Sequence, residues 1–137
     1  MAPGNADLIR SVYNIDWIDV TQRERGFSAA AEVIVPETKA RVSPEVADRT
    51  LLGLGDFAVF IQGLEQDFSE FRYDADEFAE PVRDVVVVTG HIRVRGRMSR
   101  MPLTAPFGHV WRLRDGKAMS IEAHLDPEEA LSAAARA

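Results

Sequence analysis

Three histidines and a few acidic residues near the end of the chain are the side chains best suited to acid–base or metal chemistry. The histidines are His91, His109 and His124, and the sequence has no cysteine. Local metal motifs place histidines one to a few residues apart, as in HxH or HxxxH, and these three are spaced too widely. We therefore expect no metal site. The sequence also lacks a phosphate-binding loop, a nucleophile elbow and a Rossmann fingerprint.

Glu122 and His124 are two residues apart in the last predicted strand, so their side chains share one face of it. Alternation turns this face away from the predicted interior, but a one-residue register shift or a bulge would turn both side chains inward. These two residues and Tyr13 are the candidate catalytic residues. Asp126 follows closely but is better explained as a helix cap.

The secondary structure predicted to position these residues is mainly helical in the first half of the chain and consists mainly of strands in the second half. Apolar spacing predicts a helix that begins at Asn5 or Asp7 and runs to Val20, and a second helix over 27–34 that Pro36 ends. A third helix is predicted over 51–64. A short strand is expected over 39–43.

The second half has a period of two. Strands are predicted over 71–78, 85–97, 103–114 and 118–125. Asp115-Gly116 predicts a two-residue hairpin, and Asp126-Pro127 predicts the start of a final helix. Helices followed by antiparallel strands predict an α+β fold with the helices on one face of the sheet, as a single domain over 1–137.

The pattern from Val85 onward resembles the SnoaL-like family, within the superfamily that includes ketosteroid isomerase. The motifs that carry the resemblance are Val85-Val-Val-Val88, Gly96-Arg97, Ala105-Pro-Phe-Gly-His-Val-Trp-Arg-Leu-Arg-Asp-Gly-Lys117, Leu125-Asp-Pro-Glu128 and, upstream, Ala29-Ala-Ala-Glu-Val-Ile-Val-Pro-Glu37. The resemblance implies a cone-shaped fold, in which a strongly curved antiparallel sheet wraps on about three N-terminal helices around an internal pocket.

The resemblance also implies which catalytic groups are missing. Ketosteroid isomerase uses an aspartate base, an oxyanion-binding aspartic acid and a tyrosine. Ser43 and Gly108 stand where the two acids would be, and Tyr13 is the only tyrosine of the first predicted helix. Serine without an activating base cannot shuttle a proton, so isomerisation by that mechanism is not expected.

A second implication concerns the pocket, whose walls the family pattern and strand alternation assign to one face of three strands. An alternative interpretation is that these residues are simply core. The predicted pocket residues are Ser43, Val88, Gly90, Ile92, Gly108, Val110, Ile121, Ala123 and Leu125.

The outer face of the sheet carries His109, Trp111 and His124 in this interpretation. In the superfamily this face often packs against a second subunit, so we expect a homodimer with these three residues at its interface. The arginines of Arg93-Val-Arg-Gly-Arg97 and Arg100 are expected to pair with nearby acids or to stay solvated.

Composition limits the partners. The 137 residues carry a formal net charge of −6, which argues against nucleic acid. The longest apolar run is too short to span a bilayer, so we expect no association with a membrane. The first residues lack the features of a signal peptide, so we expect a cytoplasmic location.

The resemblance and the apolar pocket pattern together imply a SnoaL-like protein that binds a small hydrophobic or polycyclic molecule without a cofactor, and the resemblance implies a polyketide cyclase or isomerase. One alternative is a non-catalytic ligand-binding or dimerisation module, favoured by Ser43 and Gly108 in place of acids. Another is an epoxide hydrolase of the same fold, which would need an Asp–Arg–Asp set inside the pocket. The sequence shows no clear equivalent of that set.

Overall fold

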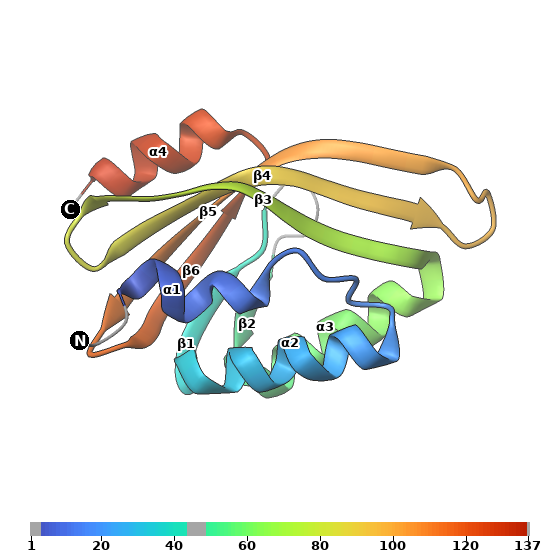
Figure 1. Cartoon of the computed structure of the whole chain (residues 1–137), viewed down its shortest axis with the longest axis horizontal. Helices are drawn as coiled ribbons and strands as arrows, with labels where there is room; N and C mark the ends of the chain where they lie inside the picture. The colour runs from blue at the N-terminus through green and yellow to red at the C-terminus, as the bar shows by residue number, and fades with distance from the viewer. Residues whose placement is uncertain (1–3, 44–48, 137) are drawn as a thin grey trace.

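The chain folds into a curved six-stranded sheet with helices on both faces (Figure 1). The structure is a computed structural model that describes residues 4–43 and 49–136. The strands are β1 (Ile34–Arg41), β2 (Thr50–Leu52), β3 (Phe68–Val82), β4 (Val85–Gly96), β5 (Pro102–Arg114) and β6 (Lys117–His124). The helices are α1 (Asn5–Ile9), the short 3-10 helix η1 (Arg10–Val12), α2 (Val20–Val33), α3 (Gly53–Asp67) and α4 (Pro127–Ala135).

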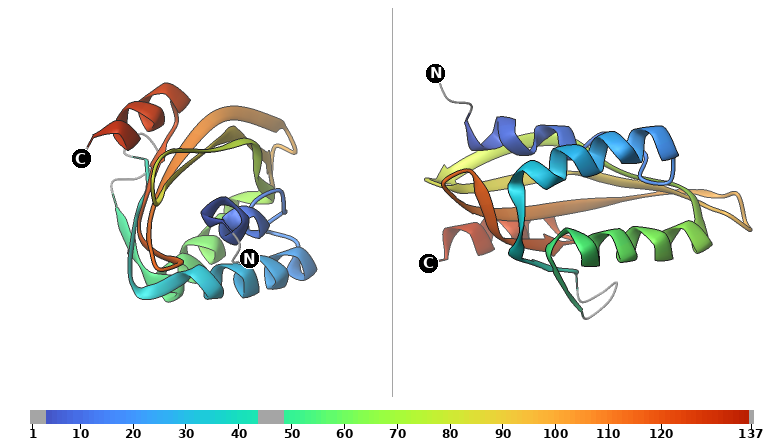
Figure 2. Two further views of the ribbon diagram at one scale, coloured as in Figure 1. Left: turned by 60° about the vertical axis from the view of Figure 1, so that its left-hand side comes forward. Right: turned by 90° about the horizontal axis from the view of Figure 1, so that it is seen from below.

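The strand order is β2-β1-β6-β5-β4-β3, and the sheet is mixed. β1 runs parallel to β6, while the other neighbours are antiparallel. The α+β class and the strong curvature are confirmed, but the prediction of a wholly antiparallel sheet is wrong at this one pair. The long β3, β4 and β5 form the curved wall, which Figure 2 shows wrapping over the N-terminal helices.

The predicted first helix ends early, because an extended segment takes the place of its second half, and α2 includes residues 21–25 that were predicted to lie between two helices. η1 ends at Val12, and α2 begins at Val20 after Asp19, whose carboxylate accepts a hydrogen bond from the backbone N–H of Gln22. The segment between them runs along the free edge of β3, where the backbone N–H of Asn14 bonds to Tyr73 O and that of Trp17 to Phe71 O. Apolar spacing could not show this break, because the segment buries residues as a helix would.

The hairpin between β5 and β6 has the predicted turn and one unpredicted bulge. Asp115 and Gly116 both have positive φ, 51° and 77°, as a two-residue hairpin turn requires. Leu113 pairs with Ala118, but Arg112 pairs with Ser120, so one residue, Met119, is left without a partner. Beyond this point every residue of β6 faces β5 one position out of the expected register.

α4 packs on the opposite face of the sheet from the other helices, contrary to the prediction that all helices share one face. It begins after Asp126, whose carboxylate accepts from the N–H of Glu128. Its alanines pack on alternate residues of β4 and β5, in a cluster formed by Val85, Val87, Val110, Ala130, Ala133 and Ala134. Gly108 permits this approach, because a Cβ there would lie 2.5 Å from Ala130 Cβ.

We expect the close packing of α2 on the Asn14–Asp19 segment to depend on Gly26. A Cβ at Gly26 would lie 2.7 Å from Trp17 Cη2 and 2.3 Å from Ile15 Cδ1, and Trp17 is fully buried. Gly26→Ala should therefore lower the free energy of unfolding by about 1–3 kcal/mol despite the better helix propensity of alanine. Denaturant unfolding measures the change.

Gly63→Ala in α3 is the matched control, because a Cβ there meets nothing within 4 Å. This substitution should stabilise the protein by roughly 0.5–1 kcal/mol. Equal effects of the two substitutions would show that Gly26 is not a packing constraint.

Candidate functional site

A cavity of about 100 Å³ lies between the inner face of the sheet and the N-terminal helices. Residues from η1, α3 and five strands form its walls, and most of them are apolar or aromatic. The lining residues are Val12, Tyr13, Trp17, Ile34, Thr38, Ala40, Arg41, Val42, Leu51, Gly53, Phe57, Phe60, Tyr73, His109, Trp111, Ile121 and Ala123. None of these described lining residues is a carboxylate.

Tyr13, His109 and Trp111 form a buried hydrogen-bonded chain in the cavity wall. The Nε1–H of Trp111 donates to Tyr13 Oη at 2.7 Å, and Tyr13 Oη lies 2.7 Å from His109 Nδ1. Indole nitrogen is only a donor, so the tyrosine oxygen accepts from Trp111. The tyrosine O–H then has His109 Nδ1 as its acceptor, which satisfies all three groups and assigns the imidazole proton to Nε2.

The surroundings keep these groups neutral. Burial, with a smaller contribution from the nearby His124, lowers the pKa of His109 to about 3. Burial raises the pKa of Tyr13 far above its ordinary value, although the hydrogen bond from Trp111 acts in the opposite direction. At neutral pH the site therefore offers hydrogen bonds from uncharged groups and holds neither an imidazolium nor a phenolate.

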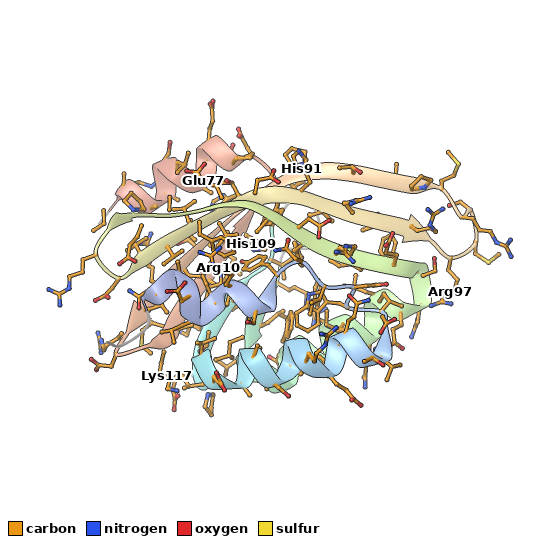
Figure 3. The ribbon with its side chains drawn as sticks, viewed as in Figure 1. Arg10, Glu77, His91, Arg97, His109 and Lys117 are labelled. Carbon is orange, nitrogen blue, oxygen red and sulfur yellow. The ribbon has the colours of Figure 1, made fainter. Side chains whose placement is uncertain are left out.

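Aromatic rings hold the imidazole in place. The ring of His109 lies 4.5 Å from that of Phe107 and 4.9 Å from that of Tyr73, measured between centroids. Figure 3 shows His109 between the sheet and the N-terminal helices, whereas His91 lies on the other side of the sheet. With Nδ1 taken by Tyr13, His109 Nε2–H is a donor with no acceptor among the described residues, in a residue that lines the cavity.

β5 presents the opposite face to the cavity from the one predicted. His109 and Trp111 were expected on an outer, dimer-forming face, yet both line the cavity and are buried within one chain. Gly108 and Val110 were expected to line the pocket, yet they contact α4 on the other side. Those two pocket assignments and the placement of His109 and Trp111 at an interface are wrong.

The bulge at Met119 is the physical reason for this error. Unbroken pairing from the turn would place Val110 opposite Ile121 and so on the same face. The bulge instead places Trp111 opposite Ile121 and His109 opposite Ala123. Ile121 and Ala123 were predicted to line the cavity and do so, but their partners on β5 are the histidine and the tryptophan.

The β4 residues predicted for the pocket share the inner face without being among the lining residues. Val88 is fully buried in the main core, and Ile92 packs against that core. A Cβ at Gly90 would lie 2.0 Å from Asp74 O, so this glycine is required by the approach of β3 rather than by a ligand.

Ser43 and Leu125 are the two remaining predicted pocket residues. Ser43 is buried and follows the lining residue Val42, and Leu125 comes directly after β6. Neither is among the described lining residues.

Glu122 and His124 lie on the α4 side of the sheet, outside the cavity. His124 Nε2 is 3.4 Å from a Glu122 oxygen, and Nδ1 is 3.9 Å from a Glu129 oxygen. Arg112 lies 3.7 Å from Glu122 on the same side. Of the three candidate catalytic residues, only Tyr13 lines the cavity. His109 and Trp111, the residues that bond to it, were missed as site residues because strand alternation alone does not reveal the bulge.

Within 4–43 and 49–136, no group of three or more histidine or acidic side chains is arranged to hold a metal ion. No helix in the same ranges has the length and apolarity needed to cross a bilayer.

Comparisons with known proteins identify the fold. The sequence matches no protein-family model and no curated protein. An NTF2-like protein of unknown function from Burkholderia pseudomallei K96243 has a similar structure, with 24% identity, a TM-score of 0.72 and coverage of 98% of this chain and 100% of that one. TerC, co-crystallised with polyporic acid, has 23% identity, a TM-score of 0.72 and coverage of 96% and 98%.

A third neighbour, assigned as a SnoaL-like polyketide cyclase from Jannaschia sp. CCS1, has 14% identity, a TM-score of 0.71 and coverage of 97% and 93%. At these identities the likeness establishes the fold alone. The chain has the NTF2-like cone fold, which confirms the fold that the SnoaL-like resemblance implied.

The protonation of His109 predicts a pH dependence of stability. The folded state keeps this imidazole neutral down to a pKa of about 3, whereas the unfolded chain protonates it near its ordinary value. The unfolded state therefore binds more protons in this window, so the contribution is complete above about pH 6.5 and is lost as the pH falls. Between pH 7 and pH 5 the wild type should lose about 2 kcal/mol more unfolding free energy than His109→Gln.

Urea unfolding of both proteins across this range measures the difference. Carboxylates common to both proteins cancel in the comparison. Parallel pH profiles would show that His109 protonates as easily in the folded chain as in the unfolded one.

Proposed function

We propose that this protein binds a small, flat, hydrophobic molecule inside the cone, with a hydrogen-bond acceptor of the ligand placed at His109. The observation that carries the proposal is the combination of an aromatic cavity with an uncharged donor, His109 Nε2–H, in a residue of its wall. Ligand sites of this kind have mostly apolar walls and a few polar groups that fix orientation. Tyr13 and Trp111 hold the imidazole in the donor tautomer.

The structural neighbours support a small-molecule role. TerC was crystallised with polyporic acid, and another neighbour is assigned as a polyketide cyclase. Because both share the cone fold but little sequence, they support a ligand inside the cone without identifying the ligand of this chain.

Cofactor-independent proton transfer, as in a cyclase or isomerase, is the second candidate. It is favoured by the chain of hydrogen bonds from Trp111 through Tyr13 to His109, which links two proton-bearing side chains at the cavity wall. A general base works best with a pKa near the working pH, and the low pKa of His109 is far from it. The geometry therefore favours binding and carbonyl polarisation over proton abstraction.

The epoxide hydrolase alternative has less support. It requires two aspartates and an arginine inside the cavity, and Arg41 is the only charged residue among the described lining residues. The ketosteroid isomerase mechanism is equally unsupported, since Gly108 faces α4 and Ser43 is not among the described lining residues.

The assembly and location stay as predictions. A homodimer in the cytoplasm remains our expectation, but its interface cannot be centred on His109 and Trp111, which are buried inside one chain. His124 remains on the outer side of the sheet, beside Glu129 of α4.

Filling the cavity should abolish binding. Ala123 lines the cavity opposite His109 in the sheet, so Ala123→Leu adds side-chain volume where the ligand is proposed to lie. We expect the affinity for 1-tetralone, a bicyclic ketone, to fall at least about tenfold, because overpacking removes the space for the ring. Quenching of Trp17 and Trp111 fluorescence reports binding, since both tryptophans line the cavity.

Ala31→Leu is the matched control, because Ala31 is exposed on α2. It should leave the affinity unchanged. Binding that survives Ala123→Leu in a folded protein would place the ligand elsewhere.

Deuterium exchange separates the two candidate functions. Binding alone leaves the exchange of the α-protons of 1-tetralone in D₂O at its uncatalysed rate, whereas proton transfer accelerates it. NMR of the ketone with and without protein measures this rate. Acceleration that is lost in His109→Gln would favour the enzyme over the binding protein.

A further inference from the structure

We propose that the hydroxyl of Tyr73 and Nε2–H of His109 act together as two donors to one oxygen atom of the ligand. This inference rests on the proposed function and names the class of ligand more narrowly. The ligand would carry a carbonyl, carboxylate or enolate oxygen on an apolar ring system, and Tyr73 would be a specificity-determining residue.

The two tyrosines of the chain differ in how their hydroxyls are used. Tyr13 Oη both accepts from Trp111 and donates to His109, so its bonds are made within the protein. Tyr73 also lines the cavity, but its hydroxyl has no hydrogen-bond partner among residues 4–43 and 49–136. A phenol hydroxyl without a protein partner, in a residue that lines an apolar cavity, is free to donate to a ligand oxygen.

Tyr73 and His109 meet although they lie on strands that are not neighbours. Tyr73 is opposite Ile92, and His109 is opposite Val88, on the two sides of β4. Gly90 lies between these positions on the same face and has no side chain to separate the rings. The ring centroids are 4.9 Å apart at 63°, about the spacing of one strand rather than two.

Both groups keep their protons over a wide pH range. Burial raises the pKa of Tyr73 to about 12, while His109 stays neutral down to about 3. Neither group becomes charged near neutrality, so the pair offers two uncharged donors and no strong base. Two fixed donors in a site with apolar walls favour an oxygen that carries or develops negative charge.

The test compares 1-tetralone with tetralin, which has the same fused rings without the oxygen. Tyr73→Phe removes only the hydroxyl, and we expect it to weaken 1-tetralone binding about three- to tenfold while changing tetralin binding less than twofold. His109→Phe should act in the same direction on 1-tetralone. His91→Phe is the matched control for the second variant, because His91 is an exposed histidine on β4.

The outcomes separate this inference from the proposed function. If neither probe binds the wild type, the proposed function fails and this inference with it. If both probes bind and Tyr73→Phe weakens neither or both equally, the cavity is a ligand site but Tyr73 is not a donor in it.

A spectroscopic measurement covers the case in which a variant fails to fold. Two donors should move the infrared carbonyl stretch of 1-tetralone bound to the wild type to lower frequency than one donor does in a simple alcohol. A carbonyl stretch that stays at its position in an apolar solvent would overturn the inference without any substitution.

Discussion

The single unpaired residue at Met119 decides which side chains of β6 share the interior face with His109 and Trp111. Side chains on a strand alternate, and the pairing of β5 with β4 already puts His109 on the face of Val88, so the extra residue in β6 brings Ile121 and Ala123 to that same face. On this face His109 and Trp111 lie against Tyr13, while Gly108 and Val110 face α4. The apolar wall beside the hydrogen-bonded residues therefore depends on this bulge, because unbroken pairing would put Glu122 rather than Ala123 opposite His109.

Much of the fold could be predicted because its signals are local. The turn at Asp115-Gly116 requires positive φ at two adjacent positions, and Asp126-Pro127 combines a helix cap with a residue suited to the first turn. Strands β3 to β6 were predicted to within a few residues for the same reason. The parallel pairing of β1 with β6 could not be predicted in this way, because it depends on where a distant strand enters the sheet.

The site was harder to predict than the fold. Alternation assigned Ile121 and Ala123 to the interior, but no residue type near Met119 indicates a bulge. Tyr13 was named from a resemblance, and the broken helix that brings its hydroxyl to His109 follows from backbone bonds to β3. His109 was assigned outward by a rule that is correct for a regular strand. Residue types thus indicated which side chains could take part in the site, but which of them face the cavity could not be predicted without the bulge at Met119.

The extended segment that follows η1 has a consequence for behaviour at high concentration. β3 is an edge strand of 15 residues, and a long open edge can pair with the edge of another molecule. Here the backbone of Asn14 and Trp17 bonds to β3, and side-chain oxygens of Asn14 and Asp16 accept from Ala75 and Phe71. The segment that holds Tyr13 in the cavity wall thus also blocks strand addition along this part of the edge, which links an intact site to resistance against aggregation.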